Sequence, residues 1–301
     1  MKILITGANG LVGQKIKSEI LKRKNIQLIA TSKSPENNIL DKDYIFETLD
    51  ITNKSGTEYI IERYKPDILI NTAAQANVND CERNRSWCWE VNAEAVKHLT
   101  HVSNRLNIHF IHFSTDFVFN GTQPSYNEES VPKPINFYGI CKQEAEEFIM
   151  AHAKKWSIIR TILVYGYVPH MRRNNIVTWI YRSLRGGRSL KIVNDQFRAP
   201  TFGEDLAWAA IEIAVKGKTG IFHISGKEEM SIYEMALKIA EHFRLNKDLI
   251  TPVPSSMLNE PAARPPHTRF DLYKAEKELN FFSHSFAESL NIIEKQIYNS
   301  Q

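Results

Sequence analysis

The sequence predicts an α/β protein in which a doubly wound parallel sheet is covered by helices on both faces. Three observations carry this expectation. Short apolar runs alternate with segments of helical periodicity. The runs are almost continuously apolar, as strands buried on both faces require. A glycine-rich turn follows the first run and opens a helix. The predicted strands of this part are Ile3–Ile5, Ile26–Ala30, Tyr44–Leu49, Ile68–Ile70, Phe110–Phe113 and Ser157–Leu163.

The pattern becomes less regular after Gly166. We expect a basic helix over Asn174–Arg185, a strand over Leu190–Val193, a helix from Glu204, a strand over Ile221–Ile224 and two late helices. This order predicts a dinucleotide-binding domain over residues 1–166, with elements returning to it from about 193–225. Residues 167–192 and 226–301 are expected to form a smaller α/β substrate-binding lobe.

Composition narrows the classes of partner. The 301 residues are 43% apolar, and the formal charge of +4 comes without a polybasic block, which argues against a nucleic-acid partner. No apolar stretch is long enough to span a bilayer, and the first strand starts so early that a signal peptide has no room, so we expect a cytoplasmic protein without a membrane partner. Cys81, Cys88 and Cys141 lack metal-site spacing and are expected to be reduced, structural thiols.

The turn between the first strand and first helix is a candidate pyrophosphate site. Glycines let the backbone approach the phosphates, and the free N–H groups and dipole of the helix start stabilise their charge. The GxxGxxG spacing resembles that of the extended short-chain dehydrogenase/reductase family, which implies an NAD(P)-binding Rossmann fold. The expected cofactor contacts here are Gly7, Asn9, Gly10, Leu11, Val12 and Gly13.

The end of the second strand indicates which dinucleotide is bound. An NAD site would place a carboxylate on the ribose there, whereas this chain has Ser32 and Lys33, a hydroxyl and an ammonium that suit a 2′-phosphate. We therefore predict NADPH, with NADH as the second choice and a solvated loop lysine as the alternative interpretation of Lys33. By the resemblance, further cofactor contacts lie near the adenine and along the path to the nicotinamide: Asp50, Ile51, Ala73, Ala74, Gln75 and Val164.

A tyrosine and a lysine four residues apart begin the helix after the fifth strand, so their side chains share one helix face. With Thr115 upstream, Tyr138 and Lys142 resemble the catalytic triad of the same family. The resemblance implies that Thr115 hydrogen-bonds the substrate carbonyl and Tyr138 donates the proton. It also implies that Lys142 lowers the tyrosine pKa and holds the nicotinamide ribose. Asn92 matches a family asparagine that supports a helix kink and a proton-relay water, with a plain surface asparagine as the alternative.

Several stretches along nearly the whole chain resemble the dTDP-4-dehydrorhamnose reductases in particular. Among them are residues 114–119 (STDFVF) and 264–268 (RPPHT). The resemblance implies NADPH-dependent reduction of a nucleotide-linked 4-keto-6-deoxysugar. Two positions depart from the family pattern, Phe117 in place of tyrosine and Leu163 in place of tryptophan. The resemblance implies that both positions shape the sugar pocket. The candidate substrate contacts are Asp116, Phe117, Asn175, Arg198 and Arg264.

Alternatives to these assignments remain open. The two arginines could be surface charges, and Asn175 could simply cap a helix. The family's proposed metal-binding glutamate has no counterpart at Gln14-Lys15, so we predict no metal. A nucleotide-sugar dehydratase or epimerase, or a non-catalytic NADP-binding subunit like methionine adenosyltransferase β, are the other functions considered. A homodimer is one open assembly state.

Overall fold

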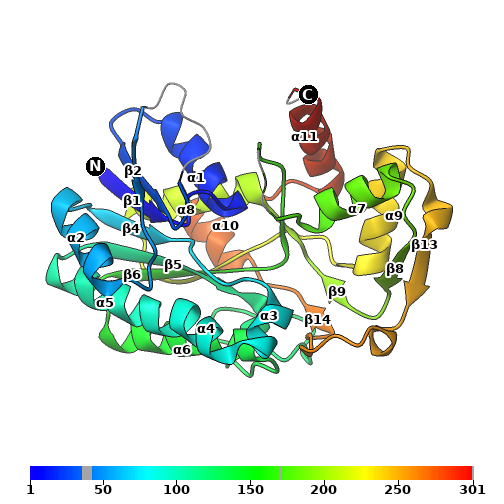
Figure 1. Ribbon diagram of the computed structural model, residues 1–301, viewed down its shortest axis with the longest axis horizontal. Helices are drawn as coiled ribbons and strands as arrows, with labels where there is room; N and C mark the ends of the chain where they lie inside the picture. Colours follow the sequence, from blue (N-terminus) through cyan, green and yellow to red (C-terminus); the bar gives the residue numbers. More distant parts are fainter. Residues whose placement is uncertain (36–42, 170, 172, 300–301) are drawn as a thin grey trace.

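The structure, a computed structural model, describes residues 1–35, 43–169, 171 and 173–299. Its centre is a seven-stranded sheet in the order β11-β6-β5-β4-β1-β2-β3, in which every neighbouring pair is parallel. The predicted doubly wound parallel sheet is therefore confirmed (Figure 1). Its strands are β1 (Lys2–Thr6), β2 (Gln27–Ser32), β3 (Ile45–Thr48), β4 (Ile68–Asn71), β5 (His109–Thr115), β6 (Trp156–Thr161) and β11 (Gly220–Ile224).

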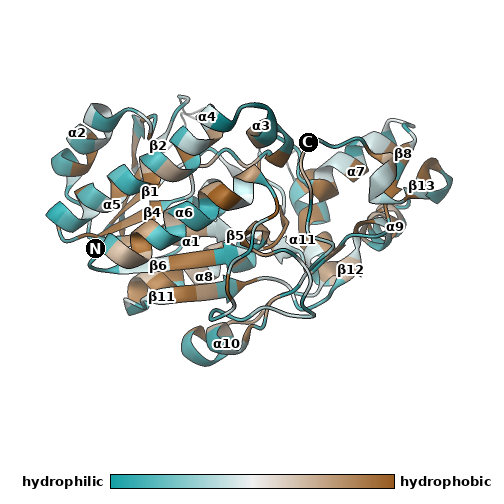
Figure 2. Ribbon diagram, turned by 90° about the horizontal axis from the view of Figure 1, so that it is seen from below, coloured by the Kyte–Doolittle hydropathy of each residue, from teal (hydrophilic) through white to brown (hydrophobic). Residues whose placement is uncertain are grey.

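Helices cover both faces of this sheet, as burial of both faces requires. On one face pack α1 (Leu11–Leu21), α8 (Gly203–Lys216) and α10 (Tyr273–Leu279), and on the other α2 (Lys54–Tyr64), α5 (Ala95–Arg105) and α6 (Phe137–His152). The alternation within β1 divides the two cores: Ile3 and Ile5 join the first, and Leu4 joins the second. Figure 2 shows the brown strands lying beneath helices whose outer surfaces are largely teal.

Short helices connect β4 to α5. They are α3 (Val78–Arg83), α4 (Arg85–Trp89) and a π-helical turn over Glu90–Glu94, and they lie against α6 at the carboxyl end of the sheet (Figure 1). Such π-helical turns are frequent at functional sites. A 3₁₀ turn, Asp116–Val118, directly follows β5 at the same end.

A smaller lobe has its own core. It packs α7 (Ile176–Arg185), α9 (Ile232–His242) and α11 (Phe286–Tyr298) against the parallel pair β8 (Leu190–Val193) and β13 (Ile250–Val253). The described part of the chain contains no helix that is both long and apolar enough to cross a membrane. Short strand pairings join the lobe to the sheet region. They involve β7 (Val164–Tyr165), β9 (Phe197–Arg198), β10 (Thr201–Phe202), β12 (Met230–Ser231) and β14 (His267–Thr268).

Two expectations about elements need correction. The strand expected to reach Leu163 ends at Thr161, because the next residues turn to pair with Thr201 and Leu163 has a positive φ of 37°. Among the residues that the structure describes, three α-helices, not two, follow Ile224. The additional one, α10, packs on the sheet through Ala275 and Leu279 although it lies within residues 226–301. The division into a domain of 1–166 with 193–225 and a lobe of 167–192 with 226–301 remains our proposal.

Candidate active site

The glycine turn fits closely between β1 and the segment after β4. Gly7 has a φ of +70°, and a Cβ there would lie 2.7 Å from the backbone nitrogen of Ala73. A Cβ at Gly13 would collide with the carbonyl of Gly7. Gly10 is exposed and N-caps α1 without any side-chain cap. The residues present therefore suit a dinucleotide: an open, glycine-lined helix start is the arrangement that accepts a pyrophosphate.

The charged groups expected to bind the adenosine half follow β2 and β3, beside this turn. Lys33 lies 2.7 Å from a carboxylate oxygen of Asp50, and its side chain is 74% exposed. The side-chain nitrogen of Asn9 donates to the carbonyls of Ser34 and Pro35 at 3.0 and 3.2 Å, which fixes the segment after β2. Burial acts to raise the pKa of Asp50, but hydrogen bonds from Lys33 and Thr52 hold that pKa below its usual value. The structure thus brings together Asn9, Lys33 and Asp50.

The three residues of the predicted catalytic triad lie at the carboxyl end of β5. Thr115 is its last residue, and its hydroxyl accepts from the amide of Phe117 at 3.2 Å. Tyr138 and Lys142 occupy the first two turns of α6, whose start is capped by Asn136 through a 2.8 Å bond from Gly139. A Cβ at Gly139 would collide with the carbonyl of Phe117. This glycine therefore lets α6 approach the turn that follows Thr115.

Burial dominates the electrostatics of the triad. It raises the pKa of Tyr138, the carboxylate of Asp116 raises it further, and a hydrogen bond with Thr115 acts in the opposite direction. Burial lowers the pKa of Lys142 to about 8. The amino group of Lys142 donates to the carbonyl of Phe113 at 2.5 Å and lies 2.9 Å from Nε2 of His112.

One implication of the resemblance concerns the pKa of Tyr138. That Lys142 lowers this pKa stays a prediction: the amino group of Lys142 is directed to β5, and the pKa of Tyr138 is raised overall. The physical reason is that the phenol is 9% exposed and lies near a buried carboxylate, and both conditions disfavour its anion.

Asn92 lies inside the π-helical turn and is buried, so the alternative of a surface asparagine is wrong. Its side chain accepts from the amide of Gln75 and donates to the carbonyl of Gln75, both at 3.0 Å. This pair of bonds fixes the segment that carries Ala73 and Ala74. Gln75 is itself buried, and its Oε1 accepts from Arg173 at 3.1 Å. Its Nε2 has no hydrogen-bond partner among the described residues.

Asp116 is buried beneath the triad. One oxygen accepts from the hydroxyl of Thr115 at 3.1 Å, and the other accepts from Thr268 at 2.6 Å. Nε of Arg198 lies 3.9 Å away. Burial raises the pKa of Asp116, while Arg198 and these hydrogen bonds oppose the rise. The predicted substrate contact at Asp116 stays a prediction, because both oxygens already have protein partners.

Arg198 is 3% exposed, so the alternative of a surface charge is wrong for it. Its terminal nitrogens donate to the carbonyls of Phe197, Pro265 and Pro266 at 2.7, 2.7 and 3.2 Å. These bonds give Arg198 a structural task in joining β9 to the segment before β14. The geometry argues against the predicted contact with a substrate diphosphate, because the donors are already engaged.

The remaining candidate substrate contacts differ in how far their side chains already have partners within the protein. Asn175 caps α7 by accepting from Val177 and Thr178 at 3.1 and 3.2 Å, which confirms the capping interpretation. Arg264 is partly buried and pairs with Glu260, and burial lowers its pKa. Phe117 is half-buried, with the guanidinium of Arg198 5.8 Å from its ring centroid and the ring of Tyr138 edge-on to it.

Lys15 lies where the family resemblance would place a metal-binding glutamate, which this chain lacks. It is 8% exposed, and its ammonium lies 2.5 Å from Glu204 and 3.3 Å from Gln296. Gln296 in turn donates to Glu204 at 2.7 Å, so one cation joins α1, α8 and α11. Across the residues that are described, no cluster of three or more His, Cys, Asp or Glu side chains suits a metal ion. The absence of a metal remains a prediction.

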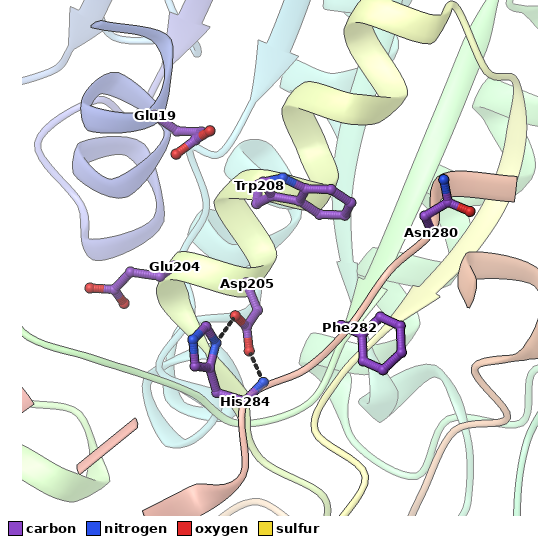
Figure 3. Close-up of a pocket in the computed structure, with 7 residues that line it drawn as sticks. All are labelled: Glu19, Glu204, Asp205, Trp208, Asn280, Phe282 and His284. Carbon is purple, nitrogen blue, oxygen red and sulfur yellow. Dashed lines mark hydrogen bonds and ion pairs between the residues drawn. The ribbon is translucent and has the colours of Figure 1, made fainter. Parts of the chain in front are cut away.

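A cavity of about 290 Å³ lies beside α1 and α8 (Figure 3). Its lining residues are Glu19, Glu204, Asp205, Trp208, Asn280, Phe282 and His284. Asp205 accepts from the backbone and the ring of His284 at 2.8 and 2.5 Å, so that carboxylate is already paired. None of the predicted site residues lines this cavity, and the candidate active site is the separate region at the carboxyl ends of β1, β4 and β5.

The parallel sheet, the glycine turn and the grouping of Thr115, Tyr138 and Lys142 define a dinucleotide-binding protein with the extended short-chain dehydrogenase/reductase fold. The family described as RmlD substrate binding domain matches residues 1–298, and the chain belongs to that family.

Relatives and solved structures agree with this membership. The chain is 31% identical to dTDP-4-dehydrorhamnose reductase of Aggregatibacter actinomycetemcomitans, covering 92% of each chain. It is 27% identical to methionine adenosyltransferase 2 subunit beta of Bos taurus, over 91% of this chain and 81% of the relative.

Among solved structures, a dTDP-4-dehydrorhamnose reductase of Clostridium acetobutylicum superposes with a TM-score of 0.88 at 30% identity, covering 99% of this chain and 100% of the other. The Bacillus anthracis reductase in complex with NADP superposes with a TM-score of 0.83 at 27% identity, covering 98% and 99%.

Proposed function

We propose that this protein is an NADPH-dependent reductase of a nucleotide-linked 4-keto-6-deoxysugar, with the activity of a dTDP-4-dehydrorhamnose reductase. The observation that carries the proposal is the intact set of Thr115, Tyr138 and Lys142 at the end of β5, close to a glycine turn that suits a dinucleotide. The relatives named dTDP-4-dehydrorhamnose reductase and the neighbour that contains NADP support it.

The proposed residues for the cofactor are the backbone of the turn from Gly7 to Gly13, Lys33 for the 2′-phosphate, and the segment from Ala73 to Gln75. When bound, NADPH supplies the hydride for the keto carbon. The exposed Lys33 ammonium can approach a phosphate without losing a buried partner. The free Nε2 of Gln75 offers a donor on the cofactor path.

The chain's own chemistry is the transfer of a proton to the keto oxygen. Tyr138 is kept in its protonated form by burial, so its hydroxyl is a donor at neutral pH. Thr115 lies within hydrogen-bond reach of this phenol and orients the oxygen that receives the proton. A reduction needs a proton donor at this position, and a phenol that stays protonated at neutral pH can supply the proton.

The other functions considered fit less well. A dehydratase of this fold would use an Asp-Glu pair after the threonine, and here Asp116 is followed by Phe117. The similarity to methionine adenosyltransferase 2 subunit beta keeps a non-catalytic NADP-binding subunit as the second candidate. The retained Thr115, Tyr138 and Lys142 favour the enzyme.

We further propose that the protein works in the cytoplasm on a nucleotide-sugar substrate, without nucleic-acid or membrane partners, and that it forms a homodimer. The test of assembly is sedimentation of the purified chain. A mass corresponding to one chain at micromolar concentration would overturn the dimer.

The test of function follows the absorbance of NADPH in the presence of purified protein and dTDP-4-dehydrorhamnose generated in place by the upstream enzymes. We expect turnover that is faster with NADPH than with NADH. Tight NADPH binding without turnover would overturn the reductase and favour the binding-subunit function.

A further inference from the structure

A buried histidine lies beside the catalytic lysine and has no task in the chemistry above. His112 is on β5, three residues before Thr115, and is fully buried. Its Nε2 lies 2.9 Å from the amino nitrogen of Lys142. In the sequence it lies in an apolar run, a pattern typical of a core residue, and the contact with α6 connects it to the site.

The opposite ring nitrogen continues the contact across the sheet. Nδ1 of His112 lies 3.0 Å from the side-chain nitrogen of Asn71 on β4. Oδ1 of Asn71 accepts from the hydroxyl of Thr6 at 2.5 Å, and Thr6 is the last residue of β1 before Gly7. All of these side chains are buried. A single hydrogen-bonded chain therefore runs from the catalytic lysine to the start of the glycine turn.

We propose that His112 is a positioning residue for the reduction: its Nε2 holds the amino group of Lys142, and its Nδ1 ties that group through Asn71 to Thr6. The proposal rests on the proposed function, because it assigns a role in the same site. A hydrogen-bonded buried network of this kind fixes one arrangement of its members, since each unsatisfied group would carry a high free-energy cost.

The donor and acceptor roles in this chain of hydrogen bonds make the tautomer of the His112 ring depend on the protonation of Lys142. In the observed arrangement Thr6 donates to Asn71, and the amide nitrogen of Asn71 donates to Nδ1. Nε2 then carries the ring hydrogen and donates to a neutral lysine amine. When Lys142 gains a proton, its ammonium can only donate, so Nε2 must accept and the ring hydrogen must move to Nδ1. The amide of Asn71 then has to turn its oxygen toward the ring.

The surroundings allow both arrangements. Burial lowers the pKa of Lys142 to about 8, and the groups that oppose this are Glu146 and Cys141 on α6, Cys88 on α4 and Cys81 on α3. Burial and Lys142 together hold the pKa of His112 well below its usual value, so the ring is neutral in both arrangements. Tyr138, one turn before Lys142 on α6, is protonated over the same range of pH.

The first test uses variants that separate the two ring nitrogens. His112→Gln keeps a polar group near the position of Nε2, His112→Asn keeps one near Nδ1, and His112→Leu keeps neither. We expect kcat to fall about 10- to 100-fold in the Asn and Leu variants and to be largely rescued in the Gln variant, with the KM for the sugar nearly unchanged. The alkaline limb of the kcat pH profile should shift in the Asn and Leu variants.

The matched controls are His109→Gln and His109→Leu. His109 is a second buried histidine on β5, but its Nε2 bonds Ser157 at 2.8 Å instead of the catalytic lysine. These controls should keep the kcat and the pH profile of the wild type. Equal losses at His109 and His112, or a wild-type kcat and pH profile in His112→Leu, would overturn the proposal.

The second test needs neither substrate nor turnover. Nitrogen NMR of ¹⁵N-histidine protein reports which ring nitrogen of His112 carries the hydrogen. We expect the hydrogen to move from Nδ1 to Nε2 as the pH rises past about 8, and this change to be absent in Lys142→Met. A tautomer that stays fixed, or that changes equally in Lys142→Met, would overturn the proposal. Because the reductase assay is separate, a failed reduction with the expected tautomer change would refute only the proposed function.

Discussion

The hydroxyl of Thr268 donates a 2.6 Å hydrogen bond to the buried carboxylate of Asp116. Asp116 follows Thr115 at the end of β5, and Thr268 belongs to β14, which pairs with β9 beside the smaller lobe. The other oxygen of Asp116 accepts from Thr115 itself. The position of β14 is thus connected directly to the threonine proposed to orient the keto oxygen.

Replacing Thr268 by valine should weaken both stability and catalysis. The substitution keeps the shape but leaves an oxygen of Asp116 without its short hydrogen bond, which costs about 1–3 kcal/mol when the group is buried. Urea unfolding measures the loss, and kcat should fall with it because Thr115 loses its support. Thr251→Val, on the exposed surface of β13, is the control and should change neither quantity. Equal behaviour of the two variants would contradict this connection.

Tyr138→Phe tests the proton donor. The ring stays buried against Phe117, so the fold should be retained, but the hydroxyl is lost. We expect kcat to fall at least about 100-fold, in the range that general acid catalysis contributes, with the Kd for NADPH nearly unchanged. Fluorescence titration of NADPH measures the second quantity. Parallel loss of binding and turnover would refute the assigned role.

Lys33→Met tests the preference for NADPH. The side chain is largely exposed, so thermal stability should not change. Loss of a charge-assisted bond to the 2′-phosphate should raise the KM for NADPH about 10- to 100-fold and leave the KM for NADH unaltered. Lys24→Met, an exposed lysine before the opposite end of β2, provides the control. If both cofactors respond equally, Lys33 does not distinguish them.

Acid should destabilise the protein through its buried histidines. Burial, with a smaller effect of Lys155, lowers the pKa of His109 to about 4, against 6.5 for an unperturbed histidine. Between these values the unfolded state binds a proton that the folded state does not, so stability falls as the pH falls from 6.5 to 4. His109→Leu should make this fall less steep, and His112 and His223 retain part of it. The measurement is the free energy of unfolding by urea at several pH values in this range. If His109→Leu and the wild type lose stability equally with falling pH, the assignment is wrong.

The sequence was sufficient for the features that depend on local pattern. The strands of the sheet are apolar runs, the glycine turn is contiguous, and Tyr138 and Lys142 are one helical turn apart, so spacing alone places them together. The sequence pattern did not predict the short helix α10, because its seven residues give little periodicity and its start has no side-chain cap. Its position is determined by the packing of Ala275 and Leu279 on the sheet.

Interactions between distant segments were not predictable in this way. The sequence predicts a substrate contact for Arg198. In the structure, the pairing of β9 with β14 places its guanidinium among backbone carbonyls. The contact of His112 with Lys142 depends on how α6 lies over β5. The signal that could have indicated it is a histidine within the apolar run Phe110–Phe113, three residues before the proposed catalytic threonine.

The most direct test of the central claim is to identify the product formed from dTDP-4-dehydrorhamnose and NADPH carrying deuterium at the transferred position. We predict a sugar nucleotide that has gained one deuterium at C4 and one proton on the adjoining oxygen, with one NADPH oxidised for each molecule reduced, and no such product with Tyr138→Phe. Recovery of unlabelled, unreduced sugar together with tightly bound NADPH would contradict the proposed reductase function.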